Sequence, residues 1–210
     1  MSIESVIKPK ITYKAKALPY EYNALEPIIT KSTLEKLYSN YEECVNYLNN
    51  AQYTFTQAYE NLENYEHFNY WVEEIAKGEF LFSLYTTYFS LMSPLGLGGI
   101  PGRKTRERAK KSLFSFARLK EHFINAGVDV NSSGWVVLMY LPEVGRFKIF
   151  QVEEGKYYGN SIIPILPCYV QDETTYSDLL YGRRQFIEKW WRLINWYEVE
   201  KNVIQADRGF

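Results

Sequence analysis

The sequence contains little cysteine, little histidine and almost no net charge. Its 210 residues include two cysteines, Cys44 and Cys168, and two histidines, His67 and His122. So few cysteines exclude a disulfide scaffold and are typical of a protein in a reducing compartment. The net charge of −1 gives no global reason to expect a protein that binds nucleic acid or a membrane surface.

The sequence also lacks a long apolar segment. No run approaches the roughly 18 uncharged apolar residues of a transmembrane helix. The N-terminus has no apolar secretory core, and the acidic Glu4 argues against a transit peptide. We therefore expect no membrane partner and a cytoplasmic location, with the mitochondrial matrix as the alternative.

Aromatic residues are abundant, and many follow a helical period. They make up 17% of the chain, so we expect a strongly aromatic interior. Ser32 and Glu35 have the spacing of a capping box at the start of a helix. Behind them, apolar side chains recur at spacings of three and four and predict an amphipathic helix: Leu34, Leu37, Tyr38, Tyr41, Val45 and Leu48. The same spacing predicts a second helix over residues 81–92.

A segment rich in glycine and proline, residues 93–102, separates two halves of the chain. It is the best candidate for a domain boundary, so residues 1–95 are assigned to an N-terminal segment with a helical hairpin and residues 96–210 to an α/β domain. Within the second half we expect a charged helix (103–125), three strands (134–142, 146–154 and 162–170) and a closing helix (186–199). The predicted fold class is α+β, with a three-stranded antiparallel sheet in the C-terminal domain.

Five ordered segments resemble the iron/manganese superoxide dismutases. They are ALPYEYNALEP (17–27), YLNNA (47–51), MSPLGLGGIPG (92–102), SFARLKEHFINAGVDVNSSGWVVL (115–138) and WRLINWYEV (191–199). Their spacing along the chain is compatible with that family. The resemblance implies the same fold as the one derived above, an α-helical hairpin packed on an α/β domain.

The resemblance also implies a metal site whose ligands are replaced in this chain. The family holds one iron or manganese ion with three histidines and one aspartate. The positions that match these ligands are Leu37 (or Lys36, if a gap falls near Asn40), Tyr85, Tyr169 and Glu173. Residues that match the surroundings of the metal are Cys44, Val137, Lys148 and Asp172, which differ from the family, and Trp135 and Tyr176, which do not.

These replacements predict a catalytically inactive, metal-free superoxide dismutase-like protein, a pseudoenzyme with a structural or protein-interaction role. Leu37 has no lone pair for a metal, so Leu37 and Tyr85 would fill the cavity, and Lys148 would pair with Glu173. The alternative is a metalloprotein with an oxygen-rich iron or manganese site made by Tyr85, Tyr169 and Glu173. Because the reference pKa of tyrosine is near 10, such phenolates need a strongly Lewis-acidic ion.

The remaining metal-binding and nucleophilic side chains show no site. Neither His67 nor His122 falls at a ligand position, and we expect both to be solvated. Cys44 and Cys168 have no histidine motif nearby and are interpreted as buried apolar fillers rather than nucleophiles.

Six basic residues within nine form a candidate interaction patch: Arg103, Lys104, Arg106, Arg108, Lys110 and Lys111. Such a run is typical of a solvated helix face, and its functional interpretation is a site for RNA or another acidic partner.

In the family, the motif that ends at Glu173 joins two subunits. Asp172 and Glu173 therefore predict an altered homodimer, or a heterodimer with a related chain. The superoxide dismutase-like proteins of mitochondrial ribosomes are similar in this respect, so a structural component of a ribonucleoprotein assembly is a further alternative.

Overall fold

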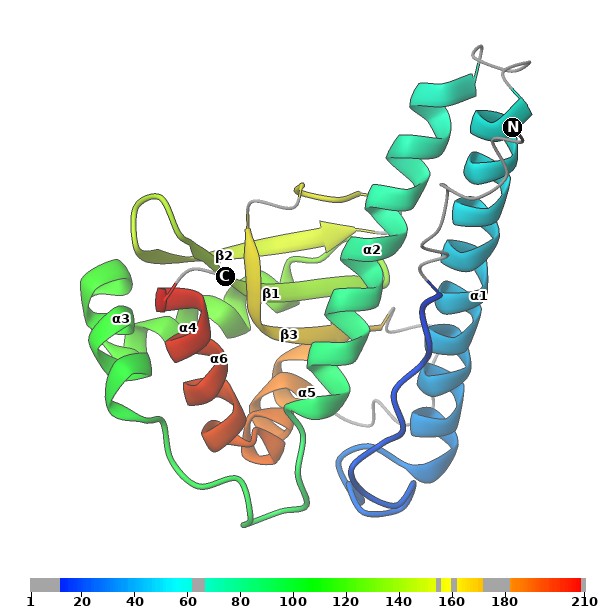
Figure 1. Ribbon diagram of the computed structural model, residues 1–210. Helices are drawn as coiled ribbons and strands as arrows, with labels where there is room; N and C mark the ends of the chain where they lie inside the picture. Colours follow the sequence, from blue (N-terminus) through cyan, green and yellow to red (C-terminus); the bar gives the residue numbers. More distant parts are fainter. Residues whose placement is uncertain (1–11, 62–66, 154–155, 160–161, 172–181, 209–210) are drawn as a thin grey trace.

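The computed structural model of the chain describes residues 12–61, 67–153, 156–159, 162–171 and 182–208. Two long helices form a hairpin along one side of the molecule, and a sheet with helices α3 to α6 forms the rest (Figure 1). This arrangement confirms the predicted α+β class and the three-stranded antiparallel sheet.

The hairpin consists of α1 (Lys31–Asn61) and α2 (Phe68–Ser90). The apolar positions predicted for the first helix lie mostly in the core of the protein. The predicted cap is wrong: Thr30, not Ser32, accepts a hydrogen bond from the backbone N–H of Thr33 (3.3 Å), because the helix already begins at Lys31. α2 begins at Phe68, well before residue 81. The apolar spacing did not predict these first turns because they are largely exposed and show no apolar period.

The sheet has the strand order β2-β1-β3. The strands β1 (Gly134–Leu141), β2 (Arg146–Glu153) and β3 (Ile163–Val170) lie within one residue of their predicted bounds. β1 is buried along almost its whole length, because it is central and α4 packs on it and on β2, while α2 and α6 pack on β3. The register places Trp135 of β1 opposite Tyr169 of β3.

The predicted charged helix over residues 103–125 is divided in two. α3 (Arg103–Leu113) and α4 (Phe116–Val128) are separated because Phe114 adopts a left-handed φ of 67°. Ser115 then caps α4 by accepting a hydrogen bond from the N–H of Arg118 at 3.1 Å.

The closing helix over residues 186–199 is divided as well. It becomes α5 (Gly182–Trp190), the 3₁₀ turn η2 (Trp191–Leu193) and α6 (Trp196–Arg208). The chain leaves the helical conformation at Ile194, with ψ of 124°. Asn195 begins α6 by accepting hydrogen bonds from the N–H groups of Tyr197 and Glu198.

The end of α2 is joined to the segment that precedes α6. Three backbone hydrogen bonds of 2.7 Å run from Ser93 to Leu193, from Asn195 to Leu91 and from Trp196 to Gly98, donor first. A Cβ at Gly98 would stand 2.0 Å from the Ile194 carbonyl oxygen, so this approach requires glycine. The domain boundary predicted between residues 95 and 96 falls within this joint and stays a prediction.

Candidate functional site

A cavity of about 660 Å³ opens between the hairpin and the sheet. The two long helices form one wall, and the ends of the strands form the other. Its lining comprises Asn40, Glu43, Cys44 and Tyr47 from α1, Glu74, Lys77, Gly78, Leu81 and Tyr85 from α2, and Ser133, Gly134, Trp135, Glu153 and Tyr169 from the sheet side. The fold thus gathers side chains from three parts of the sequence around one space.

Three aromatic side chains form the floor of this cavity. The ring of Trp135 meets the ring of Tyr85 edge-on at a centroid distance of 4.9 Å, and that of Tyr169 at 5.0 Å. Trp135 and Tyr169 face one another because they are partners in the β1–β3 register, and Tyr85 lies on the buried side of α2. The floor therefore consists of two phenols on either side of a buried indole.

Leu37 lies at a second, much smaller cavity of about 20 Å³, which Tyr88, Tyr169 and Arg183 also line. This volume suffices for about one water molecule. Of the positions that match the family's ligands, Leu37 lines the small cavity, Tyr85 lines the large one, and Tyr169 borders both. Lys36, the alternative to Leu37, is exposed.

Three of the predicted site residues lie outside the described residues: Asp172, Glu173 and Tyr176. The ligand role predicted for Glu173, and the subunit pairing predicted through Asp172 and Glu173, therefore stay predictions.

Of the residues matched to the surroundings of the metal, Cys44 lines one of the two cavities, whereas Val137 and Lys148 line neither. Cys44 lines the large cavity, and burial raises the pKa of its thiol to about 11, so it is a thiol at neutral pH. Val137 is fully buried within the sheet. Lys148 is exposed, with its ammonium 5.1 Å from the ring centroid of Phe150. Lys148 is not among the residues that line either cavity. Because Glu173 lies outside the described residues, the salt bridge predicted between the two stays a prediction.

A buried phenol that the sequence did not predict as a site residue lies beside the small cavity. Tyr88 is 1% exposed, and its hydroxyl has no hydrogen-bond partner within the described part of the chain. Burial raises the pKa of Tyr88 well above its usual value, so the group is neutral. The helical period marks this position as core, but it carries no information about the hydroxyl.

The mouth of the large cavity carries another feature that the sequence analysis missed. Tyr47 of α1 donates a hydrogen bond to Glu74 of α2, and Lys77 pairs with the same carboxylate at 2.8 Å. The bond to Glu74, together with burial, raises the pKa of Tyr47 to about 12. Lys77 and Tyr47 lower the pKa of Glu74. Only the Glu74–Lys77 spacing is local, so the contact with Tyr47 has no signal in the sequence.

The histidines and the buried cysteine lie where they were expected. His67 and His122 are both exposed, and His67 stands directly before α2. Cys168 is fully buried in β3, and burial raises the pKa of its thiol well above the usual value. These findings confirm the solvated histidines and the interpretation of Cys168 as an apolar filler.

Comparison with known proteins places this chain in a family. The family model described as iron/manganese superoxide dismutases, C-terminal domain, matches residues 101–202. A protein from Legionella pneumophila named "Superoxide dismutase (Fe)" is 30% identical over 92% of this chain and 100% of its own length. The chain belongs to the iron/manganese superoxide dismutase family.

Two other superoxide dismutase relatives extend the match across both halves of the chain. A Bacillus subtilis protein named "Probable superoxide dismutase (Fe)" is 30% identical over 90% of this chain and 67% of its own length. An Aeropyrum pernix protein named "Superoxide dismutase (Mn/Fe)" is 28% identical over 92% of both.

These relatives overturn the expectation of a catalytically inactive, metal-free pseudoenzyme. They are named as superoxide dismutases. Two of the names give iron as the metal, and the third gives manganese or iron. The prediction was wrong because it equated the replacement of the histidine and aspartate ligands at matched positions with the loss of the reaction. The relationship along nine-tenths of the chain therefore gives no support to the predicted inactivity or to the predicted absence of a metal.

The described residues alone do not fit an iron or manganese ion. Leu37 supplies no donor atom, and the floor offers only the phenol oxygens of Tyr85 and Tyr169. Within residues 12–61, 67–153, 156–159, 162–171 and 182–208, no three His, Cys, Asp or Glu side chains are grouped so that they could hold a metal ion. We therefore derive no reaction step through the metal.

Proposed function

We propose that this chain dismutates superoxide at the cavity floored by Tyr85, Trp135 and Tyr169. The observation that carries the proposal is the match along nine-tenths of the chain to proteins named superoxide dismutases. Tyr85 and Tyr169, two of the positions that match the family's ligands, both line this cavity, which supports the proposal further. As a finer part of the proposal, the chain is a divergent family member. It has a phenol oxygen at Tyr85, where the resemblance implies a histidine nitrogen, and at Tyr169, where it implies an aspartate carboxylate.

The charges at the cavity govern the entry of an anionic substrate. Among the described lining residues, Glu43, Glu74 and Glu153 are acidic and Lys77 is basic; Lys156, outside the lining, pairs with Glu153. A negative mouth repels superoxide at low ionic strength, and salt screens that repulsion. The rate constant for substrate capture is therefore expected to rise with added salt.

Metal content and turnover of the purified native chain test the proposal together. We expect iron or manganese in the protein by elemental mass spectrometry and suppression of superoxide-driven cytochrome c reduction. Tyr85→Phe and Tyr169→Phe each remove one phenol oxygen but keep the ring, and each should lower turnover about tenfold or more.

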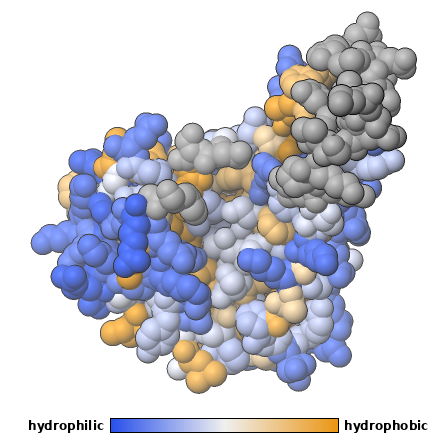
Figure 2. Space-filling model, viewed as in Figure 1, coloured by the Kyte–Doolittle hydropathy of each residue, from blue (hydrophilic) through white to orange (hydrophobic). Residues whose placement is uncertain are grey.

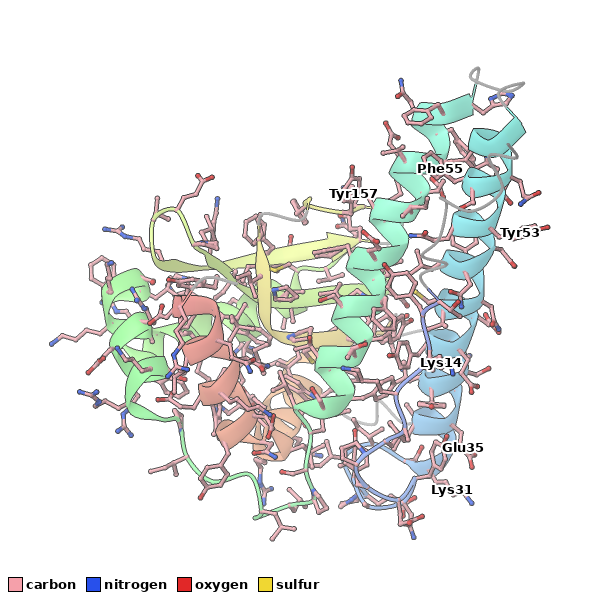
Figure 3. All side chains as sticks on the ribbon, viewed as in Figure 1. Lys14, Lys31, Glu35, Tyr53, Phe55 and Tyr157 are labelled. Atoms are coloured by element: carbon pink, nitrogen blue, oxygen red, sulfur yellow. The ribbon has the colours of Figure 1, made fainter. Side chains whose placement is uncertain are left out.

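The matched control is Tyr53→Phe on α1, which is exposed and lies toward the end of the hairpin farthest from Lys31 (Figure 3). It should leave turnover and metal content unchanged. A native chain that carries neither metal nor turnover would overturn the proposed activity. Full turnover in both the Tyr85→Phe and the Tyr169→Phe variants would instead show that the reaction does not take place in this cavity.

A further inference from the structure

Helix α3 presents a basic face to solvent. The helix carries six basic residues and one acidic residue, whereas the whole chain has a net charge of −1. Its buried side carries Thr105 and Ala109, and Arg103, Arg106 and Lys110 recur at spacings of three and four on the exposed side. Figure 2 shows hydrophilic residues gathered on the left of the molecule, where Figure 1 places α3.

One member of the predicted patch is committed to the fold. The guanidinium of Arg108 pairs with Asp207 at 2.7 Å and donates to the Gly145 carbonyl at 2.8 Å. The side chains of Arg103 and Lys104 form exposed ion pairs with Glu107, at 3.5 Å and 4.0 Å. The face available to a partner therefore consists of Arg103, Lys104, Arg106, Lys110 and Lys111.

Exposed apolar side chains bracket this basic face at both ends. Before α3, Leu97 is 67% and Ile100 is 73% exposed. After it, Phe114 is 79% exposed and holds the left-handed φ that ends the helix, with Arg118 over its ring at 5.5 Å. The β1–β2 turn with exposed Val144 lies beside the same end, because Arg108 of α3 bonds the carbonyl of Gly145.

We propose that this surface docks the protein on a membrane that contains anionic lipids. The five cations would contact the lipid phosphates, and Ile100 and Phe114 would enter the boundary between headgroups and acyl chains at either end of the helix. The sequence alone predicted no membrane partner, because its composition does not reveal which apolar residues are exposed. Within the described residues no helix is long and apolar enough to cross a membrane, so the contact is with the surface.

The distribution of charge and apolar groups favours lipid over a macromolecular partner. A protein interface has an apolar centre and a polar rim, whereas this surface has a charged centre and apolar ends. Single-stranded nucleic acid stacks successive bases on aromatic rings, whereas the exposed rings here, Phe114 and Tyr197 beside Gly99, lie at opposite ends of α3. A fluid bilayer adapts to both the cations and the separated apolar groups.

Flotation of the full chain with vesicles tests this docking. We expect binding to phosphatidylcholine vesicles that contain phosphatidylserine, no binding to phosphatidylcholine alone, and release by salt. Lys110→Gln with Lys111→Gln should weaken binding about fivefold per removed charge. Ile100→Ser with Phe114→Ser should weaken it at equal charge.

Matched controls lie on the opposite side of the molecule. Lys14→Gln with Lys31→Gln removes two exposed lysines, of which Lys14 lies beside α1 and Lys31 is its first residue. Tyr53→Ser removes an exposed ring (Figure 3). Circular dichroism checks that each variant is folded. The proposal is overturned if anionic vesicles do not bind, if the control variants lose as much binding as the α3 variants, or if only an RNA homopolymer binds the basic face.

Discussion

At the scale of single residues, the buried side chain of Arg183 binds four backbone carbonyl groups within the described part of the chain. It is 8% exposed, and its guanidinium donates to the carbonyl groups of Gln171 (3.0 Å), Val128 (3.3 Å), Ser132 (2.6 Å) and Val130. These carbonyls belong to the end of α4, the loop before β1 and the end of β3. One side chain thus fixes the position of β1, and with it Trp135.

Replacing Arg183 with lysine should destabilise the protein by about 2–4 kcal/mol, because an ammonium cannot reach four diverging carbonyls and leaves buried acceptors unpaired. Urea unfolding followed by fluorescence measures the loss. The control is Arg184→Lys, whose side chain is 46% exposed and pairs with Glu121 and Glu188. That change should cost at most about 0.5 kcal/mol, and equal losses in the two variants would contradict the assigned role.

Leu37 offers a second prediction at this scale. It is 2% exposed beside the small cavity, so Leu37→Ala should cost about 2–4 kcal/mol through lost burial and an enlarged void. Leu97→Ala removes the same atoms from a side chain that is 67% exposed, and it should change the free energy of unfolding little. Denaturant midpoints of the two variants give the comparison. A small loss at Leu37 would mean that the surrounding helices collapse onto the space.

At the scale of elements, helix α3 depends on a carboxylate from another helix. Its first residue follows Gly102, which has no side chain to cap it. Glu200 of α6 accepts hydrogen bonds from the N–H groups of Lys104 (2.8 Å) and Thr105 (2.9 Å) and from the Thr105 hydroxyl (2.6 Å). A negative group at this end also suits the helix dipole.

This cap makes stability depend on pH. Burial alone would raise the pKa of Glu200, but the bonds from Thr105 and Lys104, with Arg106 nearby, lower it below its ordinary value. Since the folded-state pKa is the lower one, the contribution is complete above the unfolded-state pKa and is lost as the pH falls through the folded-state pKa.

Glu200→Gln should therefore cost about 1 kcal/mol at neutral pH, and the difference from wild type should shrink below about pH 4. Urea unfolding at both pH values measures it. Glu198→Gln is the control, because Glu198 pairs with the exposed Lys201 and caps no other helix. A pH-independent difference at Glu200 would contradict the cap.

The elements differ in how far the sequence predicts them. The three strands were predicted within one residue, because turn residues bound each apolar run. The breaks at Phe114 and Ile194 were not, since both interrupt segments whose helical pattern continues. Phe114 ends the helix with a left-handed φ, which a phenylalanine in the sequence does not predict. Ile194 leaves the helical conformation because Leu193 and Asn195 bond to the end of α2.

At the scale of the whole molecule, the candidate site was predicted only in part. Of the ligand positions that the resemblance gave, Tyr85 and Tyr169 line the large cavity, whereas Leu37 lines the small one. The Tyr47–Glu74 contact and the buried Tyr88 hydroxyl were beyond the sequence, because they arise from packing between distant segments. The inference of inactivity failed for a different reason: side-chain identity at single positions was weighed above relationship along the entire chain.

The joint between α2 and the segment before α6 has a consequence for the order of synthesis. The hydroxyl of Ser93 and the carbonyl of Leu193 that it meets are 100 residues apart. The ribosome therefore releases both hairpin helices long before it adds the residues that anchor them. Until then, the apolar sides of the hairpin lack their permanent cover, so a nascent chain of this protein is a natural client for chaperones that bind exposed apolar surface.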